Sequence, residues 1–378
     1  MTAHQNVGTP PEARADRPPP HRGRRRPAVR WIAHGVLFVA LAVGIFGLLP
    51  RLGGLTRDAA GLRHARPAFL AAAIVAQALS LGCYAQLYRR VLAALGARIR
   101  FRLAADVTLA TFFVSHITPF GSATGTLVNA STLETESIAA ATTGEAIALT
   151  SLTSTIALIV LFGTGLAATA GRHVSHQYLI IAGIALLLVV AALAAVLVLG
   201  AHPAIAGRAG RWAANVARHV RPSIDPEQVA KTSCRLASLA RSALTGRAFL
   251  ISFGFAAGDL LFDLLSLDLV FAALRYQPGF GPLAVAYTAA NIASAIPLTP
   301  GGLGVIEVTL VAITVGFGAP RPTAVLAVLG YRIVNYWLPL LPGAIAYFRL
   351  RLRPGADGKR KGKGKPAAPQ AGRLHSGH

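Results

Sequence analysis

Two short segments of this chain carry residues that begin a helix, and each lies inside an apolar stretch. They read Thr118-Pro119-Phe120-Gly121 and Thr299-Pro300-Gly301-Gly302, the second continuing to Gly304. In a Thr-Pro pair we expect the hydroxyl to accept an unpaired backbone N–H, and proline suits the first helical position. Inside a membrane, such a start in mid-segment indicates a broken helix, whose freed backbone groups must be covered by protein or line a cavity. The two N-termini together predict an anion-binding site.

Ionisable residues inside the apolar stretches are few, and insertion of each costs about 2.5–3.5 kcal/mol. They are Asp106, Glu145, Asp259, Asp263, Asp268, Glu307 and Arg332. Asp259 and Asp263 are four residues apart and therefore share a helix face. Glu307 is expected two turns into the helix that begins at Thr299-Pro300, with its side chain towards the bundle interior.

Two interpretations of Arg332 are open. In the first, Arg332 adds a fixed charge to a phosphate site at the two helix breaks, and nearby acids orient it, bind a substrate amine or relay protons. In the second, Arg332 pairs with Glu307 or Asp263 and holds the protein together. The residues assigned to binding are Thr118, Pro119, Gly121, Thr299, Pro300, Gly301, Gly302, Gly304, Glu307 and Arg332. Those assigned to coupling or charge pairing are Glu145, Asp259 and Asp263.

No motif in the sequence points to a metal or a cofactor. Metal-ligand spacings, a P-loop, a nucleophile elbow and a dinucleotide fingerprint are all missing. His116, just before the first break, fits a hydrogen-bonding core residue better than a ligand. We therefore expect no metal, no cofactor and no catalytic residue.

The elements that position these residues are membrane helices. Apolar runs of about 20 residues predict full spans at 31–49, 68–88, 144–169, 177–200, 248–273 and 322–348. Two further apolar regions, 104–135 and 282–318, contain the breaks and are interpreted as re-entrant helical hairpins. The prediction is an all-α polytopic membrane protein with six full spans and two broken hairpins, about eight membrane segments.

The net charge of +23 is concentrated between and beyond the predicted spans. Residues 1–30, 88–102, 201–247 and 350–378 carry +5, +5, +6 and +7. This pattern predicts that all four blocks are cytoplasmic in a plasma-membrane protein, with both ends of the chain as disordered basic tails. The first hairpin then enters from the cytoplasm and the second from outside. Without interleaved aromatic residues, the charge favours anionic lipid over nucleic acid as a partner.

The two halves of the chain match at an offset of about 181 residues. Thr118-Pro119 then corresponds to Thr299-Pro300, and the spans at 68 and 144 correspond to those at 249 and 325. Three full spans precede the second copy, so its orientation in the membrane is expected to be inverted. Inverted repeats commonly form a site between the halves. The alternative is that proline and glycine merely kink two ordinary helices.

The second half also resembles a known family. Residues 296–307, Ile-Pro-Leu-Thr-Pro-Gly-Gly-Leu-Gly-Val-Ile-Glu, and then Gly330-Tyr331-Arg332 are similar to the lysylphosphatidylglycerol synthase transmembrane-domain family, the flippase-like domain of multiple-peptide-resistance proteins. The resemblance covers about 31–349 and implies a helical bundle with paired re-entrant segments. The soluble domain that attaches lysine to the lipid has no counterpart after the last helix, so this activity is not expected.

The first half departs from the family's pattern. Members commonly carry an arginine shortly after the first break and a Glu-Arg pair in the following helix. Here Gly125-Thr126-Leu127-Val128-Asn129 follows the break, and Gly144-Glu145-Ala146 retains the acid without the cation. This departure bears on whether the first hairpin binds anionic lipid.

The leading functional hypothesis is a lipid translocase that binds an anionic head group, a phospholipid or a polyprenyl phosphate, between the hairpins. One alternative is a membrane glycosyltransferase that uses a polyprenyl-phosphate sugar, with Asp58 as its candidate acid. The other is a non-transporting, lipid-binding scaffold. The oligomeric state is left open.

Overall fold

A computed structural model describes residues 65–118, 121–169, 202–218, 225–243, 246–294 and 299–352, together with isolated positions between 183 and 198. The predicted span 31–49, most of the span 177–200, both basic tails apart from 350–352, Asp58 and Pro119 lie outside these residues. Within the described ranges, all regular structure is helical.

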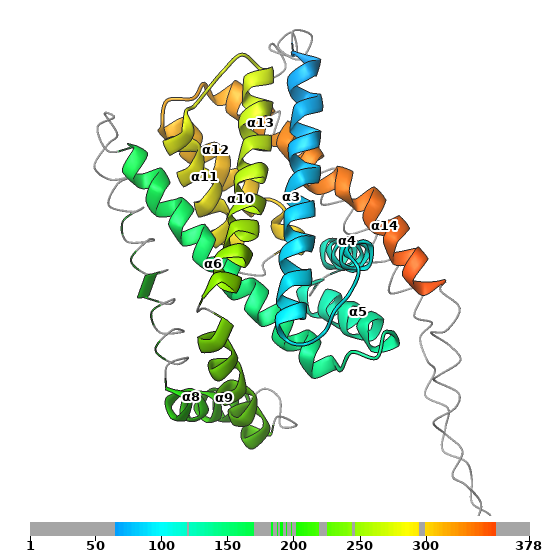
Figure 1. Cartoon of the computed structure of the whole chain (residues 1–378). Helices are drawn as coiled ribbons and strands as arrows, with labels where there is room; N and C mark the ends of the chain where they lie inside the picture. The colour runs from blue at the N-terminus through cyan, green and yellow to red at the C-terminus, as the bar shows by residue number, and fades with distance from the viewer. Residues whose placement is uncertain are drawn as a thin grey trace, which may run out of the picture.

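The helices follow one another without any intervening strand in these ranges (Figure 1). They are α3 (Pro67–Ala94), α4 (Phe101–Ile117), α5 (Gly121–Thr135), α6 (Ala140–Thr169), α8 (Pro203–Ala217), α9 (Pro226–Ala243), α10 (Arg247–Ala273), α11 (Phe280–Ser294), the 3₁₀ turn η1 (Pro300–Gly302), α12 (Val305–Gly316), α13 (Arg321–Arg332), the π-helical turn η2 (Ile333–Trp337) and α14 (Leu338–Arg351).

Four of these helical stretches are long and apolar enough to cross a membrane. They are Pro67–Ala94, Ala140–Thr169, Arg247–Ala273 and the continuous run Arg321–Arg351, which joins α13, η2 and α14. Each one coincides with a span predicted from the sequence. The prediction of an all-α polytopic membrane protein is confirmed.

The helix order of the first half is repeated in the second. α3 and α10 begin 180 residues apart (67 and 247), α4 and α11 begin 179 apart (101 and 280), and α6 and α13 begin 181 apart (140 and 321). The predicted offset therefore holds for three pairs of helices.

The first helices of the two halves, α3 and α10, pack side by side in opposite directions (Figure 1). The N–H of Arg66, at the start of α3, donates to the carbonyl of Ala273, at the end of α10, at 3.1 Å. Small residues allow close approach: a Cβ added at Gly258 would lie 3.2 Å from Cys83 Sγ. Because α4 follows α3 and α11 follows α10, the two hairpins begin at opposite ends of this pair, as an inverted repeat requires.

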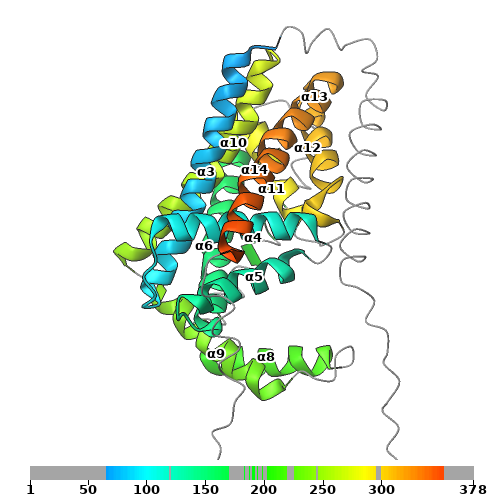
Figure 2. The same ribbon diagram turned by 90° about the vertical axis from the view of Figure 1, so that its right-hand side faces the viewer.

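The apolar regions 104–135 and 282–318 are broken helices, as predicted. α4 and α5 form the first hairpin, which runs across the direction of α3 (Figure 2). α11 and α12 form the second hairpin around η1. The proline-glycine segments thus end one helix and begin another, which is more than a kink.

Each hairpin packs on the long helix of the opposite half. α4 packs against α14, and α11 packs against α6. Glycines make both contacts possible. A Cβ at Gly165 of α6 would lie 2.7 Å from the Cβ of Ala284, and one at Gly343 of α14 would lie 2.8 Å from the Leu109 carbonyl oxygen. Each long helix thus carries a glycine where the hairpin of the opposite half packs on it, although the two glycines, 178 residues apart, do not correspond residue by residue.

The described parts of three basic blocks lie in one half of the molecule, called the basic end below. The C-terminal ends of α3 and α14 and the helix pair α8–α9 all lie in the lower half of the view in Figure 1. The exposed Arg349 of α14 reaches Asp106 of α4 there, with Nη2 and Oδ2 3.3 Å apart. Arg66 and Arg275 lie at the opposite end of the α3–α10 pair, so the basic residues are biased towards one half of the molecule without being confined to it.

Replacing Gly165 by alanine is predicted to loosen the packing of α11 on α6. The added methyl group would overlap Ala284, and overpacking of this kind costs about 1–3 kcal/mol. The matched control is Gly163→Ala on the same helix, where a Cβ meets nothing within 4 Å. Chemical unfolding in detergent should show a loss of stability for Gly165→Ala only; equal stability of the two variants would contradict the packing.

Candidate functional site

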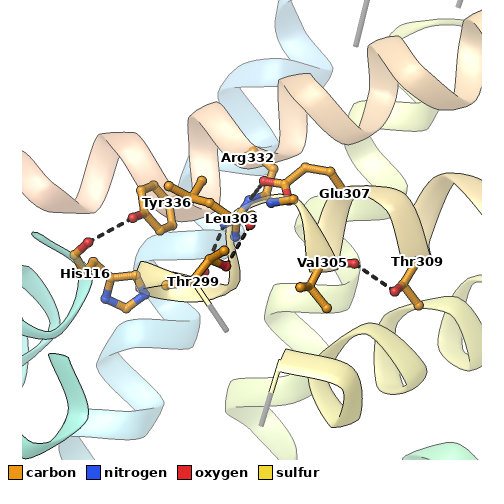
Figure 3. A network of polar contacts seen from close by, with 10 residues as sticks. His116, Thr299, Leu303, Val305, Glu307, Thr309, Arg332 and Tyr336 are labelled. Carbon is orange, nitrogen blue, oxygen red and sulfur yellow. Dashed lines mark hydrogen bonds and ion pairs between the residues drawn. The ribbon is translucent and has the colours of Figure 1, made fainter. Parts of the chain in front are cut away.

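The two helix breaks, far apart in sequence, lie against each other in the structure. The hydroxyl of Tyr336 donates to the carbonyl oxygen of His116 at 3.0 Å, and the two rings meet edge to face with centroids 5.0 Å apart (Figure 3). A Cβ on Gly301 would lie 2.7 Å from His116 Cδ2. The end of α4, the turn η1 and the turn η2 therefore converge on one point.

Glycine determines where the second helix restarts. Gly301, Gly302 and Gly304 have φ of 60°, 67° and 88°, in the left-handed region where other residues are strained. A regular α-helix begins only at Val305. Glu307 consequently lies in the first turn of α12, whereas the sequence predicted a place two turns in.

Glu307 caps the restarted helix. Its Oε2 accepts the N–H of Gly304 at 2.6 Å, which satisfies a backbone donor that the break leaves unpaired. A carboxylate at a helix N-terminus is also stabilised by the helix dipole. The N-terminus of α12 thus already holds an anion, supplied by the chain itself.

Arg332 forms a buried ion pair with Glu307. Arg332 Nε lies 2.7 Å from Glu307 Oε1, and the two side chains are 2% and 0% exposed (Figure 3). Arg332 Nη2 also donates to the Gly301 carbonyl at 3.2 Å, and the guanidinium stacks over the Tyr336 ring at 4.5 Å. Of the partners considered for Arg332 in the sequence, Glu307 is the one in contact. The pair fastens the end of α13 to the second break.

The two threonine hydroxyls make contacts that the sequence did not predict. Each donates to a carbonyl, Thr118 to Val114 and Thr299 to Leu303, both at 2.7 Å. The predicted acceptance of an N–H by Thr118 involves neighbours that lie outside the described residues. Thr118 follows the last residue of α4, where carbonyls are unpaired, and α5 begins at Gly121. At the second break, the left-handed glycines free the Leu303 carbonyl, and Thr299 satisfies it.

The π-helical turn η2 directly follows Arg332. Such a turn inserts one residue into an α-helix and changes the direction of the side chains after it, often at functional sites. Here it spans Ile333–Trp337 and places Asn335 and Tyr336 on two different partners. Periodicity alone did not predict this turn.

Asp263 is surrounded by hydrogen-bond donors. Its Oδ1 accepts from the Tyr331 hydroxyl at 2.9 Å and from Asn335 Nδ2 at 2.8 Å, and its Oδ2 accepts from the Tyr287 hydroxyl at 2.8 Å. One turn away, Asp259 accepts from the Ser80 hydroxyl at 2.7 Å. The sequence analysis found the two carboxylates but missed their donors, although Tyr331 and Asn335 flank Arg332.

Glu145 lies apart from the Arg332 site and has its own cation. Its Oε1 is 2.6 Å from Nε of Arg235 in α9, and Arg235 is 63% exposed. The positive charge beside this acid comes from a helix 90 residues further along the chain. Gly301, Gly304, Glu307 and Arg332 therefore form one site, while Asp263 and Glu145 belong to two other clusters.

Within the described ranges, no three His, Cys, Asp or Glu side chains gather in a way that would hold a metal ion.

Comparison with known proteins identifies the family. A family model described as the lysylphosphatidylglycerol synthase TM region matches residues 32–343. The chain belongs to this family. The match extends over both hairpins, three of the four membrane-length helices in full, the fourth up to Gly343, and the Arg332 site.

Individual relatives match over shorter stretches. Two UPF0104 membrane proteins of Methanothermobacter thermautotrophicus are 33% identical over 85 residues (22% of this chain, 25% of the relative) and 33% identical over 100 residues (26% and 28%). The inner membrane protein YbhN of Escherichia coli is 37% identical over 60 residues (16% and 19%). The matched stretches cover less than a third of each relative's length.

Removing the charge of Glu307 is predicted to destabilise the protein strongly. In Glu307→Gln, Arg332 stays buried without a counter-ion, and breaking such a pair costs about 3–5 kcal/mol. The matched control is Asp106→Asn, whose partner Arg349 is 60% exposed, so about 1 kcal/mol or less is expected. Unfolding of both variants in detergent micelles measures the difference. Similar small losses would show that the buried pair is not a structural anchor.

Proposed function

We propose that this membrane protein translocates a lipid with an anionic head group, a phospholipid or a polyprenyl phosphate, between its two hairpins. The observation that carries the proposal is that two broken helices from opposite halves meet at a buried Arg332–Glu307 pair. Broken helices at matching places in inverted repeats are typical of transporter sites. Membership of a lipid-synthase membrane-region family supports a lipid as the substrate.

Arg332 and Glu307 would act by exchanging partners. In the arrangement described here, Glu307 neutralises Arg332 and occupies the N-terminus of α12. A phosphate group offers Arg332 the same kind of partner and competes with Glu307 for it. Release of Glu307 would weaken the cap on α12 and the bond from Arg332 to Gly301, which together hold the second hairpin tip in place.

The packing of the hairpins would transmit the release of Glu307 to the opposite half of the protein. Each hairpin lies on the long helix of the opposite half, so a shift of one hairpin moves the other half with it. Alternating access then consists of the two halves moving against each other around the site. We propose that the basic end faces the cytoplasm and that both termini lie on that side.

Asp263 and Asp259 are the proposed coupling residues. They lie one turn apart on α10 and bond only to hydroxyl and amide donors within the described residues. Carboxylates without a cationic partner inside a membrane protein are typical of proton relays. Asp263 is linked to the site through Tyr331 and Asn335, which lie on either side of Arg332.

Lipid movement in liposomes tests the translocase. Purified protein is reconstituted with fluorescent phosphatidylglycerol or phosphatidylcholine, or with a labelled polyprenyl phosphate, and the fraction that crosses is followed by chemical quenching. We expect movement of an anionic lipid, slowed at least about tenfold by Arg332→Gln and by Glu307→Gln, because each removes one exchanging partner.

The matched control is Arg349→Gln, which removes an arginine from an ion pair at the basic end. Arg332→Lys keeps the charge and separates loss of folding from loss of transport, and each variant is first shown to be monodisperse and helical. Wild-type rates for both site variants would exclude the site. No movement of any of the three lipids by folded protein would exclude the translocase.

Replacing Asp263 by asparagine is predicted to remove the dependence of transport on a proton gradient. The amide oxygen can replace Oδ1 and accept from Tyr331 and Asn335, and the amide NH2 in the place of Oδ2 can donate to the Tyr287 hydroxyl, but the amide cannot bind and release a proton. The control is Asp268→Asn on the same helix. Transport with and without an imposed pH gradient gives the measurement; an unchanged response to the gradient in Asp263→Asn would contradict the coupling role.

A further inference from the structure

A cavity of about 860 Å³ lies at the basic end, between the α3–α4 turn and the α5–α6 turn. Its lining consists of residues 95–100, 102, 103, 136–139 and 142. It shares no residue with the Arg332–Glu307 site, and the translocation proposal makes no use of it.

The cavity carries an excess of positive charge. Arg98, Arg100 and Arg102 line it against a single acid, Glu136. Among the described residues, none of the three arginines has a carboxylate within 4 Å, whereas Arg235, Arg332 and Arg349 each have one. Positive charge that the described residues leave without a carboxylate partner beside a cavity favours an anionic ligand.

Two helices begin at the wall of this cavity. α4 starts directly after Arg100, whose side chain provides no cap, and α6 starts after Ala139, which has no hydrogen-bonding side chain. Neither helix has an acid in its first turn. The unpaired N–H groups of both helices therefore add donors to those of the arginines.

Part of the remaining wall is apolar, formed by Leu95, Ile99, Leu103 and Ile138, and the polar Ser137 and Thr142 complete it. Phe101, the first residue of α4, is 42% exposed beside the arginines. Arginines next to apolar side chains, at the end of a membrane-length helix, suit a molecule with a charged head and an apolar body.

We propose that this cavity binds the phosphate group of an anionic phospholipid from the adjacent leaflet. Arg98, Arg100 and Arg102 contact the phosphate, and the apolar walls contact the glycerol and the first part of the acyl chains. Inorganic phosphate shares the charged part of this chemistry but lacks the apolar part, so it should bind the same arginines more weakly.

Binding of fluorescent phosphatidylglycerol to the purified full-length chain in detergent micelles tests the proposal. The variant Arg98→Gln/Arg100→Gln is compared with Arg89→Gln/Arg90→Gln, which removes two charges from the same basic block outside the cavity. We expect an apparent Kd at least about tenfold weaker for the first pair and changed by less than about twofold for the second.

Each of the remaining outcomes would either support or overturn the proposed lipid site. Equal weakening by both pairs would mean diffuse attraction to a basic surface and would overturn the proposal. Equal affinity for phosphatidylcholine and phosphatidylglycerol would overturn the anionic preference. Competition by millimolar inorganic phosphate, lost in Arg98→Gln/Arg100→Gln, would support the site. Binding of inorganic phosphate with no binding of phosphatidylglycerol would overturn the lipid as ligand.

Discussion

A helix can break inside an apolar bundle only if other groups take over the hydrogen bonds that its backbone loses. The second break meets this condition with side chains: Glu307 accepts the Gly304 N–H, Thr299 donates to the Leu303 carbonyl and Arg332 donates to the Gly301 carbonyl. Tyr336 does the same for the His116 carbonyl at the first break. The charged pair thus supplies hydrogen bonds that the backbone loses at the second break. A substrate that displaced Glu307 from Arg332 would therefore change the conformation of the second hairpin.

Much of the fold could be predicted because it depends on local signals. Long apolar runs located the membrane helices, and the two Thr-Pro segments located the breaks. The exact restart of the second helix could not be predicted, since it depends on the left-handed conformations of Gly301, Gly302 and Gly304 before Val305. The carbonyl partners of the Thr118 and Thr299 hydroxyls could not be predicted either, because they depend on which backbone groups the break leaves unpaired.

The sequence predicted which residues form the candidate site better than it predicted the contacts between them. Arg332, Glu307 and Asp263 stood out as charges in apolar sequence, which is a local property. Their partners come from distant elements: Tyr287 from α11 and Asn335 from a π-helical turn. Arg235 reaches Glu145 across 90 residues. Such pairings depend on packing between helices, and a single sequence contains no measure of that packing.

The antiparallel pairing of α3 and α10 gives the chain the architecture of an antiparallel dimer joined into one polypeptide. The two repeats share their packing but not their charge. Residues 88–102 carry five arginines, whereas the corresponding residues 269–283 carry only Arg275. The positive-inside rule therefore predicts that the first repeat contains its own orientation signal, and that the second takes its orientation from the basic segment 201–247 that precedes it. On this prediction, the linker between the repeats determines that the second repeat inserts in the inverted orientation.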